Sequence, residues 1–332
     1  MESNEPISID DASKKSAEMK PLTFNEVQAI IQSDNSEKLK EISEEGRISD
    51  INMVRDISTR GSSLLMVACK GGSVECARML LDYNTDVTYR AFNDDSLLKC
   101  ACLNGNVDML YLIIECGTII NDIIILELFK SVEIVLNTQI ASILVGLIQN
   151  VNWEEEGSES YIYIYRASRA GNAAIVQLLL ERGALVMLRH CYALDIAARE
   201  GHLDVVELFI DWDATTEQIA QGRMRQAVLL ASLHGHMSII QCMIERGISV
   251  VALSLALYAA VKGNQVEIAT YLLDRGADYN AIGRSNHFSP WMHACKEGYP
   301  AMVRLLLDRG ADPNTDASGV SPCPTQRHWR YC

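Results

Sequence analysis

Residues 286–314 read NHFSPWMHACKEGYPAMVRLLLDRGADPN, and most of the chain repeats this unit less regularly. Ser289 followed by Pro290 predicts a helix start, because a serine hydroxyl accepts an unpaired backbone N–H and proline is preset for the first helical position. A second helix follows Gly298 and closes at Gly310, where glycine can take the left-handed conformation. Its apolar stripe consists of Met302, Val303, Leu305, Leu306 and Leu307. Two helices of about ten residues cannot bury this stripe alone, so the unit must stack on neighbours.

This unit resembles the ankyrin repeat in two motifs. Ser289 to Gly298 reads Ser-Pro-x-x-x-Ala-Cys-x-x-Gly, and Leu305 to Asn314 reads Leu-Leu-Leu-x-x-Gly-Ala-Asp-x-Asn. The resemblance implies an all-α fold, an ankyrin-repeat solenoid of stacked helix-turn-helix units with projecting loops. A run of such units in register is a much more specific signal than one match.

The glycine between the two helices marks the register, and it recurs at Gly72, Gly105, Gly171, Gly201, Gly235, Gly263 and Gly298. Gly72 and Gly105 lie 33 residues apart, and Gly171 follows after 66, twice that period. A degenerate repeat is therefore expected at about 118–152, centred near Thr138. Shorter intervals before Gly201 and Gly263 predict short or absent projecting loops there.

The degenerate repeat keeps the apolar stripe of a second helix, formed by Ile140, Ile143, Leu144 and Leu147. Asn150 stands where the closing glycine is expected, and Asn84 plays the same part after Leu81. Asparagine is the next-best residue for a left-handed helix end. Because its signature contacts are missing, residues 117–160 are expected to exchange amide hydrogens faster than residues 166–280.

The chain is expected to divide into a disordered tail at 1–20, an ankyrin-repeat domain at 21–314 and a tail at 315–332. Residues 21–50 are expected to form a capping repeat with its turn at Asp34. Charged residues would make its outer face soluble: Glu37, Lys38, Lys40, Glu41, Glu44 and Glu45. Residues 316–322 begin like a further repeat, but Pro324 prevents its first helix. A truncated, spliced or frameshifted longer array and a short natural tail both explain this ending.

The alternating stretch Tyr161-Ile162-Tyr163-Ile164-Tyr165 follows an acidic loop at 151–160. The alternation alone is compatible with a strand. Ala167 and Gly171 lie at the register of a first helix, so a helix is the favoured interpretation.

A net charge of −14 argues against a general nucleic-acid binder, since phosphate contacts need a basic surface. The ten cysteines follow the repeat register rather than a paired framework, which favours a reducing compartment. The N-terminus is polar, and Asp122, Glu127, Lys130 and Glu133 interrupt the most apolar stretch, so neither a signal peptide nor a membrane span is expected. We expect a cytoplasmic location, with the nucleus as an alternative.

No catalytic, cofactor or metal site is expected. Cys100 with Cys102, and His234 with His236, are the nearest approach to metal-ligand pairs. Residues two apart on a helix point in different directions, and neither pair has a second pair at zinc spacing. Phosphate-loop, hydrolase, metalloprotease and kinase motifs are missing from the sequence.

In ankyrin proteins the concave face commonly binds protein, through loop tips and the two residues before the turn glycine. Carried over residue by residue, this implies a protein-binding set of Lys70, Phe92, Asn104, Arg169, Arg199, Glu200, His234, Lys262, Phe288, Lys296 and Glu297. Its cations form a broken basic row that suits an acidic or phosphorylated peptide. Ordinary solvated charge is the alternative, and Phe288 could instead staple the helix that follows it.

Two further expectations complete the functional interpretation. Asn280 and Asn314 are of a kind that animal ankyrin proteins hydroxylate, although a structural hydrogen bond in the loop explains them equally well. The favoured function is a non-catalytic scaffold, adaptor or inhibitor that binds a partner on the concave face. The alternative is the regulatory ankyrin portion of a larger enzyme, channel or signalling protein.

Overall fold

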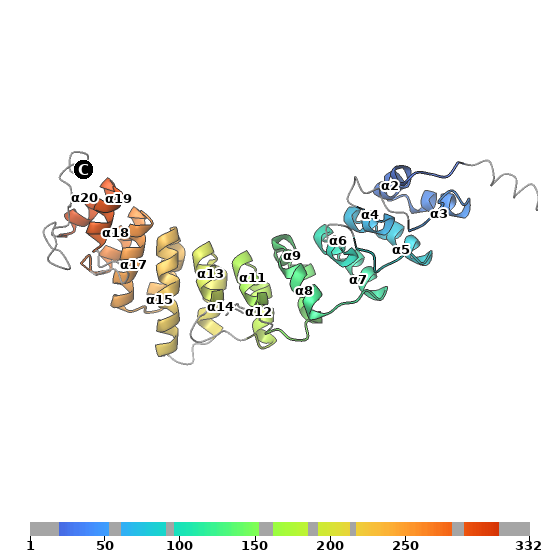
Figure 1. Ribbon diagram of the computed structural model, residues 1–332. Helices are drawn as coiled ribbons and strands as arrows, with labels where there is room; N and C mark the ends of the chain where they lie inside the picture. Colours follow the sequence, from blue (N-terminus) through green and yellow to red (C-terminus); the bar gives the residue numbers. More distant parts are fainter. Residues whose placement is uncertain are drawn as a thin grey trace, which may run out of the picture. The chain divides into compact units, whose positions relative to one another are not determined.

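The computed structural model describes residues 20–52, 61–90, 96–152, 162–184, 192–212, 217–280 and 289–311. The chain divides into two compact units, Met1–Gln149 and Asn150–Cys332, here called unit 1 and unit 2. Helices make up the regular structure of both units, as the all-α prediction requires (Figure 1). The predicted solenoid of stacked helix pairs is confirmed.

Unit 1 consists of helix pairs joined by short turns. Its helices are α2 (Phe24–Gln32), α3 (Ser36–Glu44), α4 (Leu64–Gly71), α5 (Val74–Asp82), α6 (Leu97–Asn104), α7 (Val107–Glu115), α8 (Asp122–Phe129), α9 (Val132–Leu136) and α10 (Thr138–Leu147). The first helices of successive pairs, α2, α4 and α6, pack side by side, and α9 packs beside α6. The second helices α3, α5 and α7 form another layer.

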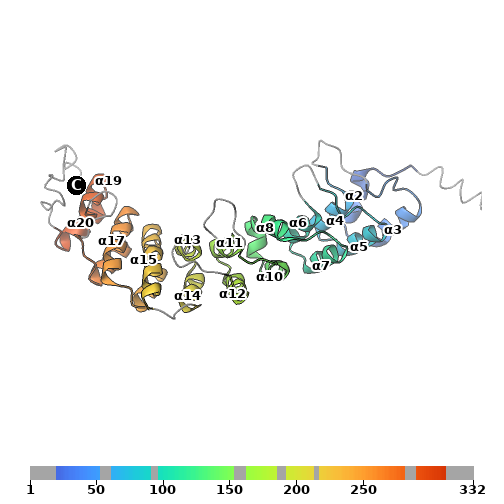
Figure 2. The ribbon, with the colours of Figure 1, turned by 60° about the horizontal axis from the view of Figure 1, so that its bottom comes forward.

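In the residues that the structure describes, unit 2 repeats this arrangement with five pairs. Its helices are α11 (Ile162–Ala170), α12 (Ala173–Glu181), α13 (Tyr192–Glu200), α14 (Leu203–Trp212), α15 (Glu217–His234), α16 (Met237–Glu245), α17 (Val250–Lys262), α18 (Val266–Asp274), α19 (Pro290–Glu297) and α20 (Pro300–Asp308). The first helices α11, α13, α15, α17 and α19 stack in sequence order. Figure 2 shows α11 and α13 in one layer and α12 and α14 in the other.

The sequence signals at helix ends operate as predicted. Ser289 Oγ accepts the backbone N–H of Met292 at 3.3 Å, and Ser63 Oγ accepts that of Met66 at 3.2 Å. Such caps satisfy donors that have no partner inside the helix. Outside glycine, the described residues with positive φ are Asp34 (50°), Asn84 (59°) and Asn264 (55°). The predicted turn at Asp34 and the predicted helix end at Asn84 are both confirmed.

The core lies between the two helix layers of each unit. Its small residues come from the first helices, where Ala68, Ala101, Ala197 and Ala260 have no exposed surface. The second helices contribute long aliphatic side chains, such as Leu80 and Leu179, which are also fully buried. Small residues on one layer let the helices approach closely, so the long side chains of the other layer fill the space between pairs. Within residues 162–170 the alternating tyrosine stretch is helical, as favoured.

The helices at 118–152, where the degenerate repeat is expected, are irregular. Its first-helix region is split into α8 and the five-residue α9, and Asn137 both ends α9 and caps α10 by accepting the N–H of Ile140 at 3.1 Å. The turn therefore lies next to Thr138, the predicted centre. The prediction for Asn150 is wrong, because α10 ends at Leu147 with Ile148 in an extended conformation (φ −64°, ψ 130°) and Asn150 has no positive φ.

The prediction that Gly263 is the turn residue between the two helices of its pair is also wrong. Gly263 has φ −84° and Asn264 takes the left-handed conformation instead. Gly263 is required for another reason, because a Cβ atom there would lie 2.0 Å from the carbonyl oxygen of Leu233 on α15. The loop before this turn is short as expected, since α17 begins at Val250, three residues after Gly247.

Several predicted segments lie outside the described residues. They are the tail at 1–19, the acidic loop from 153 to 160 with Tyr161, the loop before Tyr192, and residues 312–332 with the incomplete repeat and Asn314. Within the part of the chain that is described, no helix is long and apolar enough to span a membrane.

Candidate protein-interaction surface

The C-terminal ends of the first helices in unit 2 carry a row of charged and polar side chains. Because α11, α13, α15, α17 and α19 stack in order, equivalent residues of these helices form a line across the unit. Neighbouring helix axes lie about 8–10 Å apart in such packing. We call this line the charged row; it consists of Arg169, Arg199, Glu200, His234, Lys262, Lys296 and Glu297, all exposed.

Two cations of the charged row contact the glutamate that follows them in sequence. Arg199 Nε lies 3.8 Å from Glu200 Oε1, and Lys296 Nζ lies 3.6 Å from Glu297 Oε1. The side chains of Arg199 and Lys296 remain 54% and 60% exposed. Ion pairs this exposed contribute about 0–1 kcal/mol. A ligand carboxylate or phosphate can therefore replace the glutamate at little cost.

The backbone beneath the charged row is held by side chains of the next helix pair. His202 Nε2 lies 3.0 Å from the carbonyl oxygen of Arg169, and His236 Nε2 lies 2.8 Å from that of Arg199. Each ring also lies against the turn glycine of the preceding pair, Gly171 or Gly201. The sequence analysis missed these bonds, although the repeated Gly-His dipeptides at 201–202 and 235–236 were a usable signal.

The turn at Asn264, one residue later than predicted, places Lys262 at the register of the other cations in the charged row. With Asn264 as the turn residue, Lys262 and Gly263 are the two preceding residues. Val261, which the Gly263 register would expose beside Lys262, is fully buried. Lys262 therefore matches the register of Arg169 and Arg199 more closely than the sequence alone indicated.

In unit 1 the same register carries different chemistry. Lys70, Leu103 and Leu136 follow one another at intervals of 33 residues, and all three are exposed. Asn104 lies within the predicted binding set, but its Nδ2 donates to the carbonyl oxygen of Lys70 at 3.1 Å. Asn104 therefore fixes the backbone of the preceding pair, as the histidines do in unit 2. Phe92 and Phe288, the two predicted loop-tip aromatics, lie outside the described residues.

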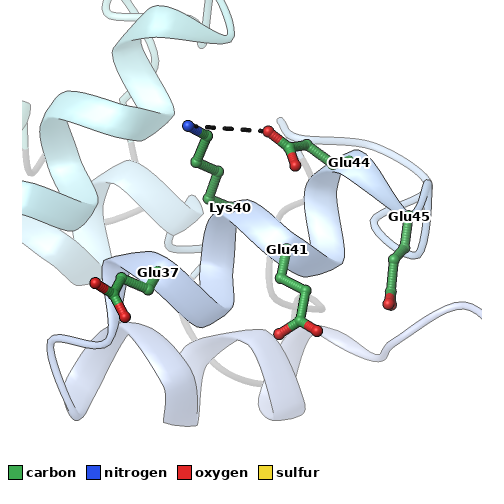
Figure 3. Close-up of a pocket in the computed structure, with 5 residues that line it drawn as sticks. All are labelled: Glu37, Lys40, Glu41, Glu44 and Glu45. Atoms are coloured by element: carbon green, nitrogen blue, oxygen red, sulfur yellow. Dashed lines mark ion pairs between the residues drawn. The ribbon is translucent and has the colours of Figure 1, made fainter.

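An acidic surface covers α3 in the first pair of unit 1. Glu37, Lys40, Glu41, Glu44 and Glu45 line a shallow hollow, in which the carboxylates spread along the helix rather than converge (Figure 3). Lys40 Nζ lies 3.9 Å from Glu44 Oε1. Among the described residues, no three His, Cys, Asp or Glu side chains are placed to hold a metal ion.

Most of the described cysteines are small buried residues. Buried are Cys69, Cys76, Cys100, Cys102 and Cys242, whereas Cys116 and Cys295 are half-buried, and none of the seven forms a disulfide. Burial raises the pKa of Cys76 to about 12 and that of Cys102 to about 12, so the nucleophilic thiolate is strongly disfavoured at both. His236 is committed to the Arg199 carbonyl, while His234 is exposed on α15.

Asn280 closes a loop bonded by side chains. Asp278 Oδ1 accepts the backbone N–H of Asn280 at 2.8 Å, and Ser254 Oγ accepts that of Asp278 at 2.9 Å. Asp50 and Asn52 form the same turn in unit 1, with a distance of 2.9 Å. Asn280 takes part in this turn through its backbone N–H, and Asp278 supplies the side chain that accepts it.

The chain is similar in sequence to known ankyrin-repeat proteins. Residues 27–123, 194–283 and 228–317, together more than half of the chain, match the family described as ankyrin repeats (3 copies). The ankyrin repeat and KH domain-containing protein mask-1 of Caenorhabditis elegans is 29% identical over 150 residues, which cover 44% of this chain and 6% of that protein. The ankyrin repeat protein nuc-2 of Neurospora crassa is 25% identical over 177 residues, which cover 51% and 16%.

A third relative matches over a longer range. An ankyrin repeat and KH domain-containing protein of Caenorhabditis briggsae is 22% identical over 289 residues, which cover 85% of this chain and 11% of that protein. The chain thus spans less than a fifth of the length of each of these relatives.

Proposed function

The chain belongs to the ankyrin-repeat family, whose repeats are generally protein-interaction modules, and on that premise we propose that it is a non-catalytic scaffold, adaptor or inhibitor. Its binding site is the charged row of unit 2, on the face that ankyrin arrays make concave. The partner is a protein segment rich in carboxylates or phosphorylated residues. The observation that carries the proposal is the alignment of four cations, Arg169, Arg199, Lys262 and Lys296, at one register position.

The chemistry of these cations favours an anionic ligand. Guanidinium groups pair with carboxylates and phosphates through two parallel hydrogen bonds, and lysine adds a point charge. The cations stand on the stacked helices α11, α13, α17 and α19, with Leu233 and His234 of α15 between them, so an extended chain crossing the row meets two cations on each side of α15. The interleaved Glu200 and Glu297 keep the row from attracting polyanions in general, which adds selectivity.

The rigidity of the row supports tight binding. The carbonyl oxygens of Arg169 and Arg199 are held by His202 and His236, so the backbone is fixed before a ligand arrives. Less conformational entropy is lost when a ligand binds a surface that is already ordered.

The test is a quantitative pull-down from cell lysate with the full chain. The variant Arg169→Ala, Arg199→Ala, Lys262→Ala and Lys296→Ala is expected to lose specific partners of the wild type. The matched control is Arg78→Ala, Arg182→Ala, Arg275→Ala and Arg304→Ala, which removes the same charge from exposed positions on second helices and their ends. Circular dichroism establishes that both variants are folded.

Three outcomes of this experiment bear on the proposal. Partners lost from the row variant and kept by the control support the charged row, and phosphatase treatment of the lysate then separates phosphorylated from carboxylate-rich partners. An unchanged partner list for the row variant contradicts the assignment to this row. Equal losses from both variants indicate a non-specific charge effect and also contradict it.

The alternative function, a regulatory ankyrin portion of a larger protein, draws support from the relatives. The matched region makes up 6%, 16% and 11% of their lengths. Sequencing full-length transcripts across the codon for Cys332 tests this alternative. A reading frame that continues into a further domain supports it, and a stop codon at that point contradicts it.

A further inference from the structure

The first helices of unit 1 expose aliphatic side chains on α6 and α9, whereas the position equivalent to Leu103 carries a cation on α11, α13, α17 and α19 of unit 2. Leu103 on α6 is 45% exposed, and Val132 and Leu136 on α9 are 51% and 56% exposed. Large apolar side chains gathered on one exposed surface mark interaction sites in many proteins. We call these three residues the apolar patch.

Leu103 and Leu136 occupy equivalent positions in successive pairs. Each is followed by an asparagine, and each asparagine lies against the turn glycine of the preceding pair. A Cβ at Gly72 would lie 2.8 Å from Asn104 Oδ1, and one at Gly105 would lie 2.9 Å from Asn137 Nδ2. Val132 precedes Leu136 by four residues and so shares its face of α9. Since α9 packs beside α6, the three side chains belong to one surface within unit 1.

The charged residues that border the apolar patch have opposite signs on its two sides. Lys99 precedes Leu103 by four residues on α6, and Lys70 on the neighbouring α4 holds the position equivalent to Leu103. On the other side, the exposed Glu133 is held by Ser131, whose hydroxyl donates to Glu133 Oε2 at 2.6 Å. The pKa of Glu133 is lowered by this hydrogen bond, so it is charged at neutral pH. The patch is therefore bordered by cations towards α4 and by a carboxylate on α9.

We propose that the apolar patch binds a partner peptide that carries aliphatic or aromatic side chains beside an acidic residue. The apolar side chains cover Leu103, Val132 and Leu136, and the acidic residue lies towards Lys70 and Lys99. A second copy of this chain fits less well, because a net charge of −14 on each molecule opposes self-association. The inference rests on the proposed protein-binding function and adds a second chemical class of ligand to it.

The experiment selects ligands without assuming their sequence. A phage-displayed library of random peptides is panned against the full chain, and enriched peptides are synthesised with a fluorescent label for titration. The patch variant is Leu103→Ser with Leu136→Ser. Its matched control is Val250→Ser with Val251→Ser, which removes two aliphatic side chains that are 62% and 70% exposed on α17.

We expect enriched peptides that combine apolar side chains with Asp or Glu. The patch variant should bind them at least about tenfold more weakly, the effect of losing one well-buried aliphatic contact. The control variant should bind them as the wild type does. Lys70→Glu should weaken binding further and shift the enriched peptides away from acidic residues.

Other outcomes overturn the inference. These are a library without enrichment, enriched peptides without apolar residues, or equal binding by the patch variant and the wild type. A dimer in light scattering that Leu103→Ser and Leu136→Ser convert to a monomer would make the occupant a second copy. The variant of the charged row is titrated alongside. Peptides lost only by that variant support the proposed function while contradicting the patch.

Discussion

Units 1 and 2 share one repeat register but carry different side chains at equivalent positions. Two residues before the turn, unit 1 carries Lys70 and Leu103, whereas unit 2 carries Leu233 and the four cations Arg169, Arg199, Lys262 and Lys296. Both units secure the backbone at this position with a side chain from the next pair, an asparagine in unit 1 and histidines in unit 2. The fold therefore constrains the carbonyl group at this position and leaves the side chain open to change.

The largest expected effect is a difference in stability between alanine substitutions at two equivalent glycines, each of which directly precedes a turn residue. Gly263→Ala in unit 2 brings Cβ within 2.0 Å of the Leu233 carbonyl oxygen, whereas Gly71→Ala in unit 1 meets only Ser73 Oγ at 3.4 Å. Forcing α15 and α17 apart should lower the free energy of unfolding by about 3 kcal/mol. Gly71→Ala should change it by less than about 0.5 kcal/mol. Urea unfolding measures both, and similar losses would contradict the close approach.

Hydrogen exchange compares the irregular end of unit 1 with the regular pairs of unit 2. The split first helix and the missing left-handed end remove helix-closing bonds from α8, α9 and α10. Their amides should exchange at least about tenfold faster than those of α12 to α18. Mass spectrometry of peptic peptides measures this, and uniform protection would refute the prediction.

Acidification should destabilise unit 2 more than unit 1, because unit 2 contains a buried histidine, His293. His293 on α19 is 7% exposed, and its ring centroid lies 5.6 Å from that of Tyr258 on α17. Burial lowers the pKa of His293; Lys296 and Lys262 lower it further, and Glu297 opposes them. The unfolded chain takes up this proton at about pH 6.5, and the folded chain only at lower pH. Stability is therefore complete above about pH 6.5 and falls as the pH drops towards the folded pKa.

The corresponding positions in unit 1 hold Val67 and Cys100 instead of a histidine. Melting temperatures measured between about pH 7 and pH 5 should fall by a few degrees for the wild type and less for His293→Leu. Hydrogen exchange at the lower pH should locate the loss in α19 and α20. Parallel curves for the two proteins would show that His293 is not responsible.

The smallest expected effect is a gain in stability of the irregular helices at 118–152. Gly146 lies in the exposed part of α10, and a Cβ there has no atom within 4 Å. Gly146→Ala should stabilise unit 1 by about 0.5–1 kcal/mol, because alanine loses less backbone entropy in a helix. Thermal unfolding and slower exchange of α10 would show it. A destabilised variant would mean that α10 is not helical at this residue.

Much of the fold was predictable because helix ends have short-range signals. Ser289 and Pro290 start α19, Asn84 follows the end of α5, and Asp34 forms the turn between α2 and α3. The register of these signals also placed the degenerate repeat near Thr138. Local chemistry was sufficient wherever one residue was clearly the best cap.

The errors arose where two residues were locally equivalent. Gly263 and Asn264 can both adopt the left-handed conformation, and the contact of Gly263 with the Leu233 carbonyl decides between them. That contact joins different helices, so no local pattern reveals it. The charged row was identified from its register, but the bonds beneath it depend on which face of the next pair holds His202 and His236.

The bonds from Asn104, His202 and His236 all run from a later helix pair to the carbonyl of an earlier one. A ribosome releases the chain from its N-terminus, so each of these carbonyl groups stays hydrated until the following pair has been synthesised. The growing array therefore always has one unfinished pair at its leading end. Translation pauses that fall between pairs would prolong the exposure of that end and set the moments at which chaperones can engage it.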